Sequence, residues 1–461
     1  MRMRTPEEKR KNREHELELA GPFLTVLAVL TLVAFLLPLR PETSMRERRR
    51  LREFPAFSVE SLLSGDWFDG ITAWFSDTFP GRETMLEVSN RMDALHGLNK
   101  NEVALGSGSS AGTDNAELDA LLEHAEAAAA ARAEEPETVM EAEPEPEQSG
   151  PADPNEVIES WEGLDAENEA AMYGDLVLID GTVMSRLGFS RESSDLHASL
   201  MNRGADALAE KGIRFFNLPA PTSSGILLSS DRLAELECAD QGKTLRYMFA
   251  QENGNVGKVN AFNNLLSHNS EYVYYHSDHH WTALGAYYAY EEFCSVAGFD
   301  PVPLSEYEEV NMGDFTGSWY YSINPQKVKH DEMIAYIPPG NIHMEIAGFP
   351  NVTSPVVDKT DDEPNMKYNC FLNGDNPITV LVNDDLPDAP DCLVYKDSFG
   401  NPFAVYLAQH YHRVYVLDYR YNFTAASITA EQYGVSDVVL VQSIGVSQSM
   451  SAMGLLQNLM N

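Results

Sequence analysis

Short apolar runs alternate with helix-length segments over the last part of this 461-residue chain. Near-continuous apolar strands separated by helices are typical of a sheet that is buried on both faces, and such sheets are mostly parallel. The pattern therefore predicts an α/β fold in which helices sandwich a parallel sheet. The expected strands are 174–180, 213–223, 271–277, 378–383, 392–398, 413–419 and 437–443, and the expected helices include 193–212, 283–298 and 402–411.

Two polar motifs coincide with the ends of two of these runs. Residues 276–282 read His-Ser-Asp-His-His-Trp-Thr, and residues 396–401 read Lys-Asp-Ser-Phe-Gly-Asn. Sites in parallel sheets form where the strands end at their carboxyl side, so we expect both motifs at one edge. Asp278, His280 and Ser398 are the residue types of an acyl-transfer triad. In such a triad the serine attacks, the histidine takes its proton, and the aspartate fixes the histidine tautomer.

Ser398 stands between a predicted strand and a predicted helix. Asn401 is a good N-cap and Pro402 suits a first helical position, so we expect the helix to begin there. Free N–H groups at a helix N-terminus can stabilise an oxyanion, and Gly400 permits a close approach. An ordinary serine in a strand-to-helix turn is the alternative interpretation.

The two adjacent histidines project in different directions, so only one of them can readily share a site with Asp278 and Ser398. We assign His280 as the general base and leave His279 to line the pocket or to pack. A metal site made by His276, Asp278 and one or both later histidines is a second interpretation. A buried structural histidine pair is a third.

Other residues near the same edge are candidates for contacting a substrate. Arg420 follows the run 413–419 among tyrosines, where it could orient a carboxylated or hydroxylated sugar or simply stack on those tyrosines. Trp281 is more often a wall or core residue, and Lys396 and Asp397 have structural interpretations as well. The predicted substrate-binding residues are His279, Trp281, Asn401 and Arg420, with Asn217, Thr222 and 373–375 as further polar candidates; no cofactor and no metal are predicted.

Residues 19–39 contain no charged side chain, and their centre reads PFLTVLAVLTLVAFLLP. About 20 apolar residues are enough to cross a bilayer as a helix, and no small-residue cleavage site follows. We therefore expect an uncleaved transmembrane anchor. Six Lys and Arg residues flank it on each side, so the positive-inside rule does not decide the orientation.

The net charge of −39 is concentrated in one segment. Between Asp114 and Glu169 there are 19 acidic residues and one basic residue, Arg132. This segment is too polar to fold alone, so we expect it to be disordered or partly helical around 117–133 and to act as a solvated spacer or as an arm that interacts with cations or the cell wall. The runs 101–107 and 174–180 could be two arms of a hairpin with this insert at its tip.

The predicted organisation has five parts. They are a basic cytoplasmic tail (1–18), the transmembrane anchor (19–39), a membrane-proximal segment with an aromatic-rich helix at 65–83 (40–105), the acidic insert (106–168) and the catalytic domain (169–461). Outside the insert the chain is still acidic, which argues against a nucleic-acid partner. The cysteines Cys238, Cys294, Cys370 and Cys392 have no metal-binding spacing, and one or two disulfides or four buried thiols are equally compatible with the sequence.

The motifs HSDHHWTALGAYYAY and VYKDSFGNPF resemble the two signatures of bacterial DHHW proteins. These proteins are similar to the acetyltransferases that O-acetylate alginate and to SGNH-hydrolase-like domains. The segments RRRLREFPAF and WFSDTFPGRE also resemble the membrane-proximal part of that family. The resemblance covers about 49–105 and 174–443.

The resemblance implies a flavodoxin-like, SGNH-hydrolase-like fold and carries Asp278, His280 and Ser398 over as the triad. It also implies a membrane-anchored O-acyltransferase or esterase that acts outside the cytoplasm on cell-envelope polysaccharide. An acyl donor, supplied by a membrane acyl-transporting partner, would then be needed. The glycine and asparagine oxyanion segments of SGNH enzymes have no clear match in the sequence, so a non-catalytic glycan-binding or envelope-assembly module remains an alternative, with a metal-dependent hydrolase as a third.

Overall fold

The computed structural model divides the chain into two compact units, residues 1–99 and 100–461. In the first unit, Thr43–Ser44 (β1) pairs antiparallel with Arg49–Arg50 (β2), and Trp67 and Trp74 are helical, as predicted for 65–83. Apart from a few residues up to Thr78 in that unit, the structure describes residues 115–133, 156–158, 160–164, 170–323, 325–346, 353–359, 364–421 and 424–461.

The predicted anchor, residues 19–39, and the run 101–107 lie outside the described residues. No helix within the described ranges is long and apolar enough to cross a membrane.

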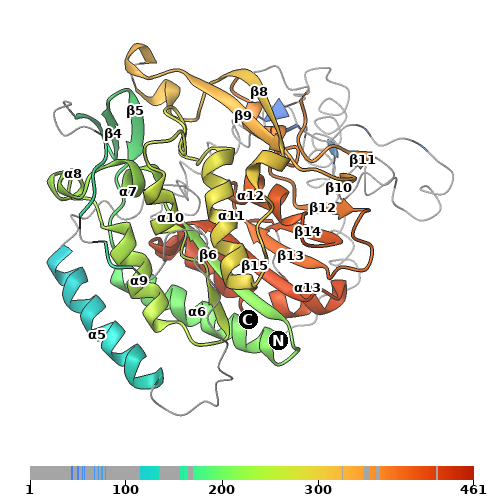
Figure 1. Ribbon diagram of the computed structural model, residues 1–461, viewed down its shortest axis with the longest axis horizontal. Helices are drawn as coiled ribbons and strands as arrows, with labels where there is room; N and C mark the ends of the chain where they lie inside the picture. The colour runs from blue at the N-terminus through green and yellow to red at the C-terminus, as the bar shows by residue number, and fades with distance from the viewer. Residues whose placement is uncertain are drawn as a thin grey trace, which may run out of the picture. The chain divides into compact units, whose positions relative to one another are not determined.

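The second unit is built around an eight-stranded mixed sheet with helices on both faces (Figure 1). Its strands, in spatial order, are β11 (Thr353–Ser354), β10 (Ile342–Ile346), β12 (Ile378–Asn383), β14 (Arg413–Asp418), β13 (Cys392–Lys396), β15 (Asp437–Ser443), β6 (Arg214–Ala220) and β7 (Val256–Lys258). The pairings among β14, β13, β15, β6 and β7 are all parallel, as predicted.

The expectation of a wholly parallel sheet is wrong at one end. Strand β12 pairs antiparallel with β14 and with β10, which in turn pairs antiparallel with β11. Only residues 384–391 join β12 to β13, and a parallel crossover needs a dozen or more residues, usually including a helix. The short link therefore reverses the chain, and the apolar run 378–383 carries no sign of that reversal.

Alternate residues of the parallel strands feed two separate hydrophobic cores. Val394 and Val439 pack with helices of one face, whereas Leu393 and Leu440 pack with helices of the other. Side chains of a strand point alternately to opposite faces, so runs that are apolar at every position suit a sheet covered on both sides. The first face carries α10 (Phe262–Ser267), α11 (Ala283–Ala297) and α12 (Gly400–Leu407), and the second carries α6 (Arg191–Ala209), α13 (Ala426–Tyr433) and α15 (Met450–Leu459).

Two smaller antiparallel sheets complete the unit. The first contains β3 (Ala171–Tyr173), β4 (Leu176–Ile179) and β5 (Thr182–Ser185), and the second contains β8 (Glu308–Phe315) and β9 (Asp331–Ile337). Both edges of β4 are occupied, by β3 and by β5. The predicted pairing of 174–180 with 101–107 is therefore replaced by local hairpins. The short helices α7 (Ser223–Leu227), α8 (Ser230–Glu235) and α14 (Ile444–Ser447) connect the other elements.

The run 271–277 is not a strand, contrary to expectation. Its one bridge joins Tyr274 to Trp281, so the run forms one arm of a tight loop. Its tyrosines are held individually, because the Tyr272 hydroxyl donates to Asp331 and the Tyr274 hydroxyl donates to the carbonyl of Pro221. Hydrogen bonds from side-chain hydroxyls thus hold this segment in place, where a strand would be held by backbone hydrogen bonds to its neighbours. Apolar composition alone does not distinguish such a loop from a strand.

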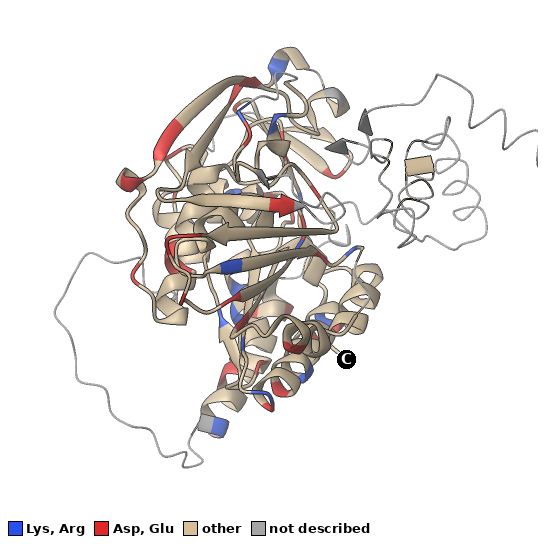
Figure 2. Cartoon of the chain, turned by 90° about the vertical axis from the view of Figure 1, so that its right-hand side faces the viewer, with Lys and Arg blue, Asp and Glu red and all other residues tan. Residues whose placement is uncertain are grey.

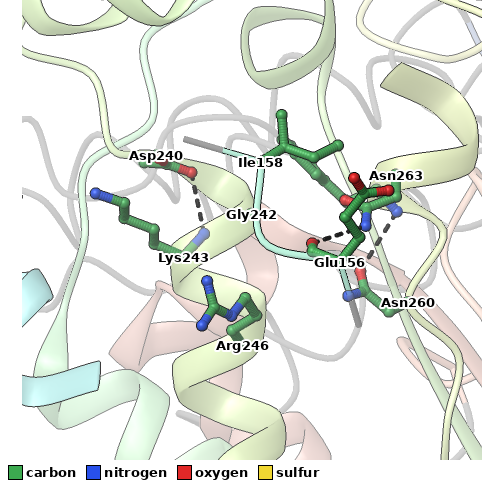
Figure 3. A pocket seen from close by; sticks show the side chains of 9 residues that line it. Glu156, Ile158, Asp240, Gly242, Lys243, Arg246, Asn260 and Asn263 are labelled. Atoms are coloured by element: carbon green, nitrogen blue, oxygen red, sulfur yellow. Dashed lines mark hydrogen bonds between the residues drawn. The ribbon is translucent and has the colours of Figure 1, made fainter. Parts of the chain in front are cut away.

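Part of the acidic insert folds against the domain. The helix α5 (Asn115–Ala133) includes the predicted 117–133, and it buries Leu118 and Leu122 against Tyr247 of α9 (Gln241–Gln251). Ion pairs from Lys243 and Arg246 of α9 to two acidic residues of α5 add to this contact. In Figure 3 the same two cations line a small hollow at the start of α9, where Asp240 accepts the backbone N–H of Lys243. The insert is therefore more than a solvated spacer.

A buried carboxyl group beside β6 predicts a pH-dependent stability. Burial raises the pKa of Glu252 to about 8, against opposing effects of Lys258 and of a hydrogen bond from Asn217. Between about pH 4.5 and 8 the folded chain keeps this proton while the unfolded chain has lost it, so stability falls as the pH rises through that window. We expect Glu252→Gln to match the wild-type Tm near pH 5 and to exceed it by about 2 °C or more at pH 8.5. A difference in Tm that does not grow with pH, measured by calorimetry, would contradict this.

The four cysteines are buried free thiols, so the disulfide alternative is not realised. Burial raises the pKa of Cys238 to about 11 and that of Cys294 to about 12, which keeps both protonated and unreactive at neutral pH. Lys and Arg residues are scattered among more numerous Asp and Glu residues over the described part of the chain (Figure 2). An excess of acidic over basic residues disfavours contact with a phosphate backbone.

Candidate active site

Ser398 lies in a tight turn between β13 and α12. The Asp397 carboxylate fixes this turn, because one oxygen accepts the backbone N–H of Phe399 (2.9 Å) and the other accepts the backbone N–H of Ser443 (2.8 Å) at the end of β15. A Cβ atom on Gly400 would lie 2.4 Å from Cβ of Lys396, so this turn requires glycine. The helix begins at Gly400, not at the predicted Pro402.

The loop that carries Asp278 and His280 is held from two directions. The Asp331 carboxylate accepts the backbone N–H groups of His276 and Ser277, both at 2.7 Å. After the loop, Thr282 caps the N-terminus of α11 by accepting the N–H of Gly285, where the sequence predicts a helix start. The loop is thus rigid without being the end of a strand.

The structure brings Ser398, His280 and Asp278 together in one hydrogen-bonded chain. Oγ of Ser398 lies 2.6 Å from Nε2 of His280, and Nδ1 of His280 lies 2.5 Å from Oδ1 of Asp278. The second carboxylate oxygen of Asp278 accepts the backbone N–H of Ser318 at 2.6 Å. Asp278 is fully buried, and Ser398 and His280 are nearly so. This is the order of contacts that a serine nucleophile, a general base and an orienting carboxylate require.

Tyr368 adds a contact that the sequence did not predict. Its ring stacks on the His280 ring, with centroids 4.1 Å apart and planes 14° apart, and its hydroxyl donates to the carbonyl of Ser398 at 2.9 Å. One side chain therefore positions both the imidazole and the backbone of the nucleophile. Tyr368 lies in the short 3-10 helix Lys367–Cys370, and nothing in that local sequence indicates such a role.

The two neighbours of His280 have different surroundings. His279 packs its ring 3.8 Å from that of His280 and places Nδ1 2.9 Å from the Ser318 hydroxyl. Trp281 is fully buried and donates from Nε1 to the carbonyl of Phe399 at 3.0 Å. Trp281 therefore links the histidine loop to the serine turn and is not a surface that a substrate reaches, which corrects its predicted substrate-binding role.

Asn401 and Arg420 belong to a buried network of charged residues next to the serine turn. The Asp375 carboxylate forms ion pairs with Lys396 and Arg420, each at 2.7 Å, and accepts a hydrogen bond from the Asn401 side-chain amide at 3.0 Å. Burial by itself would raise the pKa of Asp375, but Lys396 and Arg420 hold it well below its usual range. Arg420 also pairs with Asp418, while its guanidinium lies 5.9 Å from the ring centroid of its neighbouring tyrosine. Asn401 and Arg420 are thus engaged within the protein, although both were predicted to contact substrate.

Among the described residues, Asp278, His279 and His280 have the spacing of metal ligands. His276, a ligand in the metal interpretation, instead directs Nδ1 to the Thr182 hydroxyl at 2.7 Å. Both oxygens of Asp278 accept N–H groups and His280 contacts Ser398, so these donor atoms are already used. The arrangement fits a triad better than a cation site.

The family and structural comparisons agree with this fold. A protein-family model described as "DHHW protein" matches residues 47–417, which is more than half of the chain and includes Asp278, His280 and Ser398. No curated protein matches the chain. A DHHW family protein from Eubacterium siraeum is 23% identical, with a TM-score of 0.57 over 63% of this chain and 98% of that one.

Two further solved structures are similar to this chain at lower identity. PatB1 of Bacillus cereus, solved with a sulfonyl adduct, is 16% identical with a TM-score of 0.50 over 62% of this chain and 98% of that one. The O-acetyltransferase domain of Pseudomonas putida AlgJ matches at 11% identity and a TM-score of 0.33, over 63% of this chain and 99% of that one. The extent of the family match and the mixed α/β fold together show that this chain belongs to the DHHW family.

Proposed function

We propose that this protein is an O-acyltransferase or esterase that acts on a cell-envelope polysaccharide through Ser398, His280 and Asp278. The observation that carries the proposal is the unbroken hydrogen-bonded chain from the Ser398 hydroxyl to the Asp278 carboxylate. The motif resemblance to polysaccharide acetyltransferases supports the substrate class.

The reaction would proceed in two balanced steps. Ser398 Oγ attacks the carbonyl of an acyl donor while His280 Nε2 takes the hydroxyl proton; the donor's leaving group then departs with that proton and leaves an acyl-serine. A sugar hydroxyl next attacks the acyl carbon, gives its proton to His280, and releases Ser398 as the proton returns to Oγ. Water in place of the sugar would give hydrolysis.

The oxyanion of each step needs a donor near Ser398. Among the described residues, no acceptor binds the backbone N–H of Ser398, which lies just before α12. A backbone N–H in this position, together with the positive end of the helix dipole, suits a negative oxygen that forms on the attacked carbonyl. We propose this group as one oxyanion donor, in place of the glycine and asparagine segments that have no clear match in the sequence.

We further propose that residues 19–39 anchor the protein as a single transmembrane span, with the catalytic unit outside the cytoplasm. The support is the uncharged run itself and the substrate class. An acyl donor outside the cytoplasm would have to be delivered across the membrane, which calls for a membrane acyl-transporting partner.

Reaction with phenylmethylsulfonyl fluoride tests the nucleophile directly. Ser398 Oγ should displace fluoride and gain one sulfonyl group per chain, visible as a single mass increase that maps to the peptide containing Ser398. PatB1 has been solved with a sulfonyl adduct, which makes this reagent class a suitable probe. Ser398→Ala should abolish the adduct, and Ser267→Ala, an exposed serine outside the site, should keep it.

Two outcomes would favour other functions. If the folded protein binds polysaccharide but Ser398 stays unmodified, the chain is a binding or assembly module. If it binds Zn²⁺ at one ion per chain and His280→Ala abolishes that binding, the Asp278, His279 and His280 cluster is a metal site and the chain is a metal-dependent hydrolase.

A further inference from the structure

One short segment, residues 368–376, contacts the serine turn at three points. The Tyr368 hydroxyl donates to the carbonyl of Ser398 at 2.9 Å. The Asp375 carboxylate binds two side chains that flank this serine in the sequence, those of Lys396 (2.7 Å) and Asn401 (3.0 Å). We call residues 368–376 the clamp segment, because it holds the turn before, at and after the nucleophile.

The clamp segment makes a left-handed turn between Tyr368 and Asp375. Leu372, Asn373 and Gly374 have φ angles of 55°, 57° and 83°. Glycine adopts such angles freely and asparagine tolerates them, but a leucine there is unfavourable because its Cβ comes too close to the following carbonyl oxygen. Backbone of this kind persists only where the surrounding structure enforces it, and it is concentrated at functional sites.

Two sets of contacts enforce this left-handed turn. Leu372 is buried, and its N–H donates to the carbonyl of Val356 at 3.1 Å. The side-chain amide of Asn376 donates to three successive carbonyls, those of residues 372, 373 and 374, at 3.0, 3.2 and 3.5 Å. Because Asn376 directly follows Asp375 in the chain, the same amide also limits how far the Asp375 carboxylate can move.

The left-handed turn sets the separation between Tyr368 and Asp375, and through them the geometry of the triad. The Tyr368 ring stacks on that of His280 with centroids 4.1 Å apart, so a shift of the clamp segment would move the general base and the Ser398 backbone together. Ser398 Oγ and His280 Nε2 are 2.6 Å apart. A displacement of about 1 Å at reacting groups can cost roughly 100-fold in rate, even when the substituted residue is remote.

We propose that Asn376 is a positioning residue for the reaction of Ser398. It acts through the left-handed turn, by keeping Tyr368 and Asp375 at the separation that holds the serine turn, rather than on the triad itself. The inference rests on the proposed function, because it concerns the reactivity of Ser398. It adds a residue whose own side chain supplies no catalytic chemistry.

A matched pair of substitutions in the full chain tests this role. Asn202 is half-buried like Asn376 and also donates to a backbone carbonyl, but its partners are Gln251 and Asn253. We expect Asn376→Ala to lower the second-order rate of Ser398 sulfonylation by about tenfold to 100-fold, and Asn202→Ala to stay within about twofold of wild type. The kcat for acetyl transfer should fall by the same factor with KM within about twofold. Thermal unfolding confirms that each variant is folded at the assay temperature.

A double variant separates positioning from a general loss of stability. Tyr368→Phe removes the hydroxyl that bonds the Ser398 carbonyl and keeps the stacked ring. If Asn376 acts through Tyr368, the Asn376→Ala/Tyr368→Phe chain should react within about twofold of Asn376→Ala alone, because coupled residues do not contribute additively. Losses that multiply would overturn the inference, and so would an unchanged rate in Asn376→Ala.

Substitutions of Asn373 test the turn even if Asn376→Ala does not fold. Glycine keeps the left-handed conformation at this position, whereas a β-branched valine strongly disfavours it. We expect Asn373→Gly to react within about twofold of wild type and Asn373→Val to react about tenfold or more slowly. Equal rates in these two variants would contradict the inference. An unmodified Ser398 in the wild-type chain would instead overturn the proposed function, so the two failures are distinguishable.

Discussion

His280→Ala should reduce acyl transfer by about 10⁴-fold or more, because the Ser398 hydroxyl loses the only base within hydrogen-bonding distance among the described residues. Steady-state transfer of acetyl from a p-nitrophenyl ester, with hydrolysis measured in parallel, provides the rate.

The pairing of His280 with Ser398 also predicts non-additivity. A His280→Ala/Ser398→Ala double variant should be no slower than Ser398→Ala alone, because residues that act as one catalytic unit do not contribute independently. Thermal unfolding of each variant provides the control for folding. Independent, multiplying losses would mean that the two residues act separately, and the triad mechanism would then fail.

Asp278→Asn should lower the transfer rate by about 10³- to 10⁴-fold with the fold intact. An asparagine keeps an oxygen for the backbone N–H of Ser318 but can present an amide N–H to His280, which favours the wrong imidazole tautomer. The rate of Ser398 sulfonylation against pH should fall across the whole range, because the carboxylate no longer stabilises the imidazolium.

Asp331→Asn is the informative comparison for that variant. Asp331 holds the same loop but does not touch His280, so its loss should disturb the loop without changing the tautomer preference of the ring. The tautomer is read from ¹⁵N chemical shifts of labelled histidine. If both variants give the same ring signals, Asp278 does no more than hold the loop.

The parallel part of the fold was predictable because each strand can be recognised from its own residues alone. The runs 392–398, 413–419 and 437–443 correspond to β13, β14 and β15, since buried strands need apolar residues at every position. The direction of a strand depends on the connections that lead into and out of it, which the strand's own residues do not show. The antiparallel direction of β12 was therefore missed. The run 271–277 was misassigned because its tyrosines are buried through hydroxyl hydrogen bonds, which composition does not record.

The candidate site also has a part that the sequence predicted and a part that it did not. Asp278, His280 and Ser398 stand in two short motifs with residue types that suggest a triad, and the structure brings them together. Their supports were missed because each comes from a distant segment: Tyr368 lies 30 residues from Ser398, and Ser318 lies 40 from Asp278. Such contacts have no periodicity or spacing that a single sequence displays.

The two links between the motif segments, from His280 to Ser398 and from Trp281 to Phe399, each span 118 residues of chain. Closing so long a loop costs entropy that local structure does not repay, so contacts of this range form late in folding. We therefore expect nucleophile reactivity to emerge only with the last cooperative step of refolding, after most helical signal has returned. Reactivity of Ser398 would then report that folding is complete, because Ser398 in partly folded chains would not react.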